Sequence, residues 1–81
     1  MQPYIMIEIE LKLFVTLSEY LPKSGEHVEI RENSNINDLI SFLDIPDDSV
    51  KLIFVNGKMQ NRNYVLAHND RVGLFPPVGG G

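Results

Sequence analysis

The chain has 81 residues, and 43% of them are hydrophobic, which is enough for one small core and too little for two. It contains no cysteine, so it has no disulfide framework, thiol nucleophile or thiolate metal site. The net charge of −4 disfavours nucleic acid as a ligand and favours a protein partner with a basic face. No apolar run approaches the roughly 20 residues that a membrane span needs, and the N-terminal stretch lacks the basic start of a signal peptide, so we expect a cytoplasmic protein.

The first part of the chain predicts a β-hairpin. In residues 5–15 every second residue is isoleucine, leucine or valine, which is typical of a long strand with one buried face. Pro22 and Gly25 then mark a reversal, and residues 27–30 alternate again over a shorter stretch.

One amphipathic helix follows. Its apolar residues have the i, i+3, i+4, i+7 spacing of a helix with one buried face: Ile36, Leu39, Ile40 and Leu43. Asn35 is placed to cap the first turn, Asp38 suits the helix dipole at the third position, and Pro46 marks the end.

The second half predicts another hairpin and a closing strand. Residues 52–55 are a dense run of β-formers, and Asn56-Gly57 is a strong signal for a two-residue turn. In the later turn Asn69 is the residue best suited to a left-handed conformation, and residues 71–75 alternate once more.

This order predicts an α+β fold, a mixed sheet of four to five strands with one main helix on one face. We expect the domain to span residues 1–75 and a flexible tail to span residues 76–81. The expected core is Ile7, Ile9, Leu11, Leu13, Ile36, Leu39, Ile40, Leu43 and Val72 or Leu74.

Residues 75–81 read FPPVGGG and raise the question of whether this tail has a function. A terminal carboxylate is an anion at neutral pH and reacts only after activation. The chain has no phosphate-binding loop motif and no cysteine to hold an acyl group, so another protein has to activate it. The two prolines stiffen the exit, the glycines fit a narrow channel, and the six tail residues can project on the order of 20 Å. The alternative is an ordinary disordered terminus.

Phe14 and Phe75 are candidates for a binding surface. Both have the parity opposite to the core positions of their strands, and these two strands are neighbours in the predicted sheet. A sheet covered by one helix leaves its other face open, and large apolar residues there are typical of an interface. Alternatively, a loop or the N-terminal arm MQPY covers them, and the same two possibilities apply to Ile53.

The titratable residues do not predict a metal site. His27 and His68 lie in different predicted segments without the spacing of metal ligands. Asp44, Asp47 and Asp48 lack the spaced oxygen ligands and the glycine of a calcium loop, and are typical of a solvated turn after a helix.

Several stretches resemble the MoaD/ThiS sulfur-carrier proteins, which have the ubiquitin-like β-grasp fold. The matches are LKLFVTLSEYLP in the first strand, NINDLI at the helix start, VNGK, HNDRVGLF and the terminal PPVGGG. The resemblance implies a carrier without catalytic activity or a bound cofactor. An adenylyltransferase related to ubiquitin-activating enzymes would use ATP to adenylate Gly81. A sulfur relay would then convert the adenylate to a thiocarboxylate, with Gly80 leaving room for these reactions.

The family has two branches. MoaD is the small subunit of molybdopterin synthase, and its tail enters the large catalytic subunit, whereas ThiS supplies sulfur to thiazole synthase for thiamin. The sequence from Phe75 through Pro76, Pro77 and Val78 looks like the MoaD ending, while Gly79 is more typical of ThiS. We favour MoaD and expect these five residues and Phe14 to bind the partner.

Two other functions fit the same residues. One is a protein modifier whose last glycine forms an isopeptide bond with lysine side chains, because its activation also proceeds through an adenylate. The other is a β-grasp interaction module with an inert tail.

Overall fold

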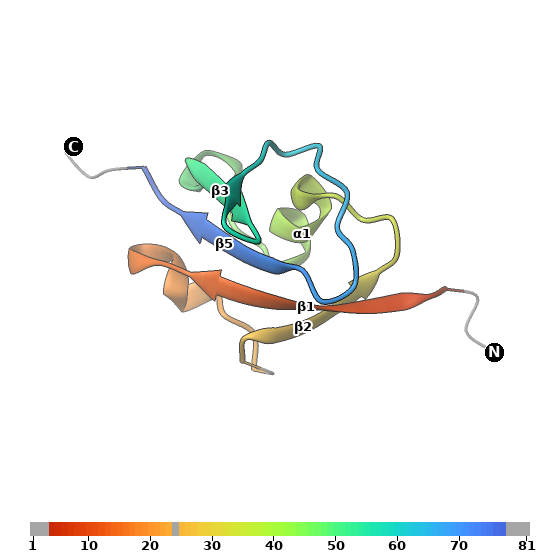
Figure 1. Ribbon diagram of the computed structural model, residues 1–81. Helices are drawn as coiled ribbons and strands as arrows, with labels where there is room; N and C mark the ends of the chain where they lie inside the picture. Colours follow the sequence, from red (N-terminus) through yellow and green to blue (C-terminus); the bar gives the residue numbers. More distant parts are fainter. Residues whose placement is uncertain (1–3, 24, 78–81) are drawn as a thin grey trace.

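The computed structural model describes residues 4–23 and 25–77 and shows a five-stranded mixed sheet with one α-helix (Figure 1). The α+β class, the strand number and the main helix are therefore as predicted. In chain order the elements are β1 (Met6–Leu13), the 3₁₀ helix η1 (Val15–Tyr20), β2 (His27–Arg31), α1 (Ile36–Phe42), the 3₁₀ helix η2 (Asp47–Ser49), β3 (Leu52–Val55), β4 (Lys58–Met59) and β5 (Arg71–Phe75).

The strand order across the sheet is β2-β1-β5-β3-β4. The central strands β1 and β5 run parallel, with Leu11 opposite Val72 and Leu13 opposite Leu74. The remaining pairs, β1 with β2, β5 with β3 and β3 with β4, are antiparallel. Because β1 and β5 run in the same direction, both strands end on the same side of the molecule (Figure 1).

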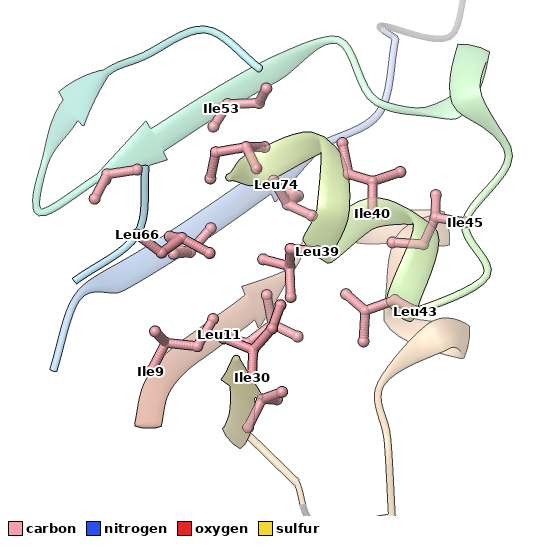
Figure 2. Close-up of a cluster of buried hydrophobic side chains, with 14 of the residues drawn as sticks. Ile9, Leu11, Ile30, Leu39, Ile40, Leu43, Ile45, Ile53, Leu66 and Leu74 are labelled. Atoms are coloured by element: carbon pink, nitrogen blue, oxygen red, sulfur yellow. The ribbon is translucent and has the colours of Figure 1, made fainter. Parts of the chain in front are cut away.

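The core lies between the sheet and α1, where side chains of the strands point toward the helix (Figure 2). The predicted core residues are buried, and both Val72 and Leu74 belong to the core. Leu13 is the exception, because it is only partly buried and packs against the edge of the cluster. Residues that the periodicity did not single out complete the core, among them Leu17 of η1 and Leu66 of the loop before β5.

The predicted first strand is too long at both ends. Ile5 and Val15 are 65% and 76% exposed, although the alternation placed both on the buried face. β1 ends at Leu13, and Val15 adopts a positive φ of 56°, which turns the chain into η1. This turn brings Leu17 into the core, so burial of Leu17 replaces a continuation of the strand.

The local signals for turns and caps are confirmed. Asn35 and Asp38 form a reciprocal capping box, in which each side chain accepts a hydrogen bond from the other's backbone N–H. Asn56 and Gly57 have φ values of 53° and 85°, as a tight hairpin turn with two left-handed residues requires, and Asn69 has a φ of 71°. The helix ends at Phe42, before the expected stop at Pro46.

Candidate functional site

Three phenylalanines form a cluster on the face of the sheet opposite α1. Phe14 and Phe75 stack with ring centroids 4.2 Å apart and an interplanar angle of 4°. Phe54 of β3 meets Phe75 edge-on, with centroids 5.6 Å apart. All three side chains are only partly buried, so the two residues that parity predicted for the open face do lie together there. We call Phe14, Phe54 and Phe75 the aromatic cluster.

Both possibilities considered for Ile53 placed its side chain on the open face of the sheet, and this placement is wrong. Ile53 is 5% exposed because it pairs with Leu74 and shares the core face of that residue. Its neighbour Phe54, which pairs with Gly73, occupies the open face instead. Sequence reasoning missed Phe54, and the signal that could have found it is the register of β3 against β5.

A hollow of about 410 Å³ lies beside the aromatic cluster on the open face. Gly73 is one of its lining residues, and an added Cβ there would lie 3.4 Å from Cε2 of Phe14 and 3.8 Å from Cε1 of Phe75. A methyl group at this position would therefore make ordinary van der Waals contact with both rings. Charged residues on the strands line another part of the hollow: Glu10, Lys12 and Arg71.

The N-terminal arm was the alternative cover for this surface. Within the described part of the arm, Tyr4 instead packs on Arg31 of β2, with the guanidinium carbon 3.7 Å from the ring centroid. Met59, which pairs with Phe54, is 63% exposed and extends the apolar surface across β4. An apolar group on an open sheet face of this kind is typical of a protein interface.

The tail begins beside the aromatic cluster. The carbonyl of Phe75 accepts a hydrogen bond of 2.7 Å from the backbone N–H of Lys51, which holds the last residue of β5 in place. Pro76 and Pro77 follow, half-buried and exposed respectively. The remaining predicted site residues lie outside the described part of the chain: Val78, Gly79, Gly80 and Gly81.

A buried carboxylate fixes the start of β5. Asp70 is 6% exposed and accepts hydrogen bonds from the Nδ2 of Asn56 at 2.9 Å, the backbone N–H of Ala67 at 2.8 Å and the hydroxyl of Tyr64 at 3.3 Å. Asn56 in turn accepts from the backbone N–H of Arg71 at 2.9 Å. Desolvation, followed by the charge of Asp70, raises the pKa of Tyr64, so its hydroxyl remains a donor. These bonds tie the two asparagine-containing turns together.

Replacing Asp70 with alanine is expected to lower the free energy of unfolding by about 1–3 kcal/mol, because the part-buried donors of Asn56 and Ala67 lose their acceptor. Urea unfolding followed by circular dichroism measures the change. The exposed Asp48 provides the control, since Asp48→Ala removes the same charge without a buried partner. Equal stabilities of the two variants would contradict a structural role for Asp70.

The described residues hold no group of three or more histidine, aspartate or glutamate side chains that could bind a metal ion. His68 accepts a hydrogen bond of 3.1 Å from the backbone N–H of Glu8, and Asp47 pairs with Arg62 at 3.2 Å. In the same residues no helix is both long and apolar enough to cross a membrane.

Comparison with known proteins identifies the family. The model of the ThiS family matches residues 11–81, which include the last strand and the glycine tail. The chain belongs to the ThiS family. This ThiS-family chain is therefore a ubiquitin-like carrier or modifier of the ThiS/MoaD kind, a class whose members are typically not catalytic themselves. No curated protein matches it.

Solved structures confirm the β-grasp fold of this ThiS-family chain. Small archaeal modifier protein 1 of Haloferax volcanii is 22% identical, with a TM-score of 0.66 over 89% of this chain and 99% of that one. A putative molybdopterin converting factor subunit 1 from Pyrococcus furiosus is 23% identical, with a TM-score of 0.63 over 89% and 99%. A chain from the complex of subunits 1 and 2 of the molybdopterin-converting factor of Helicobacter pylori is 25% identical, with a TM-score of 0.55 over 93% and 100%.

Proposed function

We propose that this protein is a sulfur carrier whose C-terminal Gly81 is adenylated, converted to a thiocarboxylate and used as the sulfur donor in molybdopterin biosynthesis. The observation that carries the proposal is the extent of the family match, which runs to residue 81 and so includes the glycine end. A tail that begins beside an apolar surface supports it, because a partner docked on that surface could receive the tail.

In the proposed reaction the carrier supplies only the reacting carboxylate, and other proteins catalyse each step. A carboxylate oxygen of Gly81 attacks the α-phosphorus of ATP, and pyrophosphate leaves. A hydrosulfide equivalent from the relay then attacks the carbonyl carbon, AMP leaves as the acyl C–O bond breaks, and the thiocarboxylate remains. The adenylyltransferase supplies the ATP site, and the carrier contributes a narrow tail and a docking surface.

Molybdopterin is favoured over thiamin by the lead-in to the tail. Phe75, Pro76, Pro77 and Val78 look like the MoaD ending, and the Helicobacter pylori complex shows a structural relative assembled with subunit 2 of its converting factor. A large catalytic subunit of molybdopterin synthase is the proposed acceptor. The third glycine at Gly79 keeps delivery to thiazole synthase as the alternative within the family.

Protein modification is the second candidate, because the same adenylate can lead to an isopeptide bond and one of the similar structures is a small archaeal modifier protein. Intact-mass analysis of the protein from its own cells separates the two. A sulfur carrier gains one sulfur in place of one oxygen. A modifier instead yields conjugates of higher mass that contain lysine isopeptides. If neither the sulfur-for-oxygen exchange nor conjugates of higher mass are found, an inert tail is favoured.

The aromatic cluster is proposed to dock the partner, which makes Phe75 the central test. Phe75→Ala is expected to weaken partner binding roughly thirtyfold or more, because a well-packed aromatic anchor commonly contributes 2 kcal/mol or more. Calorimetric titration with the cognate partner measures the affinity, and thermal unfolding confirms that the domain stays folded.

Phe42 on α1 supplies a matched control, since it is 57% exposed and lies outside the aromatic cluster. Phe42→Ala removes the same side chain and is expected to leave the affinity unchanged. Equal losses from both variants would mean that the open face is not the docking surface.

A further inference from the structure

β2 is an edge strand, because its one neighbour in the described sheet is β1 (Figure 1). In an antiparallel pair, the backbone groups of successive residues point alternately to the neighbour and away from it. At one end of this pair the N–H of Leu11 donates to the carbonyl of Glu26 at 2.6 Å. At the other end the N–H of Glu32 donates to the carbonyl of Ile5 at 2.8 Å. Counted from these bonds, the N–H and carbonyl of Glu29 point away from β1 and are open to another strand.

The two edges of the sheet differ in how they are protected. β4, at the other edge, has two residues and begins with Lys58, and short strands and lysines are common protections against pairing with another chain. β2 has five residues, contains no proline and pairs with β1 without a bulge. Its residues line a hollow of about 440 Å³ together with Asp38 and Phe42 of α1. The β2 edge is therefore longer and more accessible to an incoming strand.

The exposed side chains of β2 include an acid and a base without ion-pair partners among the described residues. Glu29 lies directly opposite Glu8 of β1, and like charges in this position destabilise a sheet. The carboxylate of Glu8 has the Nδ1 of His27 at 3.8 Å, but none of the ion pairs in the described chain includes Glu29 or Arg31. Arg31 instead packs against the ring of Tyr4. The position of Glu29 is thus unfavourable in the isolated domain, and a cation from another chain would relieve it.

β2 is complementary to a second copy of itself in one antiparallel register. The backbone groups of Glu29 and Arg31 both point to the open edge, so these residues would meet as hydrogen-bonded pairs. With the two-fold axis beside Ile30, Glu29 of each copy lies opposite Arg31 of the other. With the axis beside Glu29, two carboxylates face each other, which is unfavourable. The carbonyl of Arg31 already accepts from the N–H of Ser34 at 3.2 Å and has a second lone pair for the partner strand.

We infer that two copies of this chain associate through their β2 strands, with Glu29 of each copy opposite Arg31 of the other. The sheet then continues across the dimer, and the outward backbone groups of these two residues are paired. The net charge of −4 on each chain opposes association. At about 0.15 M salt the Debye length is about 8 Å, so the directly opposed charges outweigh those further away. One strand from each copy makes a small interface, and we therefore expect a dimer that dissociates on dilution.

The dimer leaves the proposed docking surface free. The aromatic cluster lies on β3, on β5 and just after the end of β1, and β1 separates β5 from β2 in the strand order. The tail also begins at the end of β5, away from the β2 edge. The inference therefore does not depend on the proposed function, and each copy in the dimer keeps its own tail available.

Sedimentation equilibrium of the full chain over a wide range of protein concentrations tests the inference. Glu29→Arg alone and Arg31→Glu alone are each expected to weaken the dimer about tenfold or more, because both opposed pairs then carry like charges. An equimolar mixture of the two variants is expected to regain the parent affinity as a mixed dimer, since each copy supplies the charges that the other lacks. Glu19→Arg is the control, because it makes the same change of charge at an exposed position of η1 and should leave the dimer intact.

Thermal unfolding at low concentration separates association from folding. Glu29→Arg is expected to be at least as stable as the parent there, because Glu8 then lies opposite a cation. A parent protein that stays monomeric at every concentration would overturn the inference, as would a dimer that neither variant weakens. Failure of the mixture to recover would overturn the pairing of Glu29 with Arg31. Equal weakening by Glu19→Arg would show that net charge, and not the β2 edge, controls association.

Discussion

Deleting Gly81, or extending the chain by one residue beyond it, is expected to abolish adenylation by the cognate activating enzyme. Either change moves the terminal carboxylate along the tail by about 3.5 Å, and a shift of about 1 Å in a reacting group can already cost a hundredfold in rate. An added residue other than glycine would also place a Cβ beside the carbonyl carbon that has to react. ATP–pyrophosphate exchange with each purified variant measures the loss.

The melting temperature is expected to stay nearly constant in both tail variants, because the described core contains no side chain beyond Leu74. Addition of one residue at the N-terminus provides a control of equal length change at the other end, and this variant should exchange at the parent rate. Parent-level exchange from the C-terminally extended chain would contradict the sulfur-carrier and modifier functions together, and would leave an interaction module with an inert tail.

The sequence predicts most of the fold where the determining interactions are local. The capping box of Asn35 and Asp38 and the turn at Asn56 depend on residues within a few positions of each other, so their residue types carry the information. The alternation in β1 correctly identifies the core face from Ile7 to Leu11 because one side of that strand packs under α1.

The errors arise where tertiary contacts decide. The alternation continues through Val15, yet the chain turns there so that Leu17 can reach the core, and no local pattern announces a left-handed valine. Phe54 was missed for a related reason. In a short apolar strand such as β3, the buried side follows from the register against β5, and pairing of Ile53 with Leu74 sets that register.

The candidate site shows the same division. The alternation along β1 and β5 was sufficient to predict that Phe14 and Phe75 lie together. The two strands are parallel neighbours, so residues of matching parity point to the same face of the sheet. Both rings also lie within van der Waals reach of a Cβ at Gly73, a proximity that only the three-dimensional arrangement reveals. The function of the glycine tail remains a prediction from the sequence and the family. It is supported by the position at which β5 ends, beside the aromatic cluster.

Replacing Leu39 with alanine is expected to lower the free energy of unfolding by about 2–5 kcal/mol. Leu39 is 0% exposed, and its side chain points from α1 toward the strands at the centre of the core (Figure 2). The truncation leaves a cavity between the helix and the sheet, and the neighbouring side chains can close it only in part. Because small domains are stable by only about 5–15 kcal/mol, this single change removes a large share of the total.

Urea unfolding measures this loss, and Phe42→Ala is its control on the same helix, because that side chain is 57% exposed and little buried contact is lost. A Leu39→Ala protein as stable as the parent would show that α1 does not cover the sheet with this face. The tail variants and Leu39→Ala together distinguish an effect on stability from an effect on the reaction at the terminal carboxylate. At a temperature where Leu39→Ala is still folded, it should be adenylated at the parent rate, whereas the stable tail variants should not react at all.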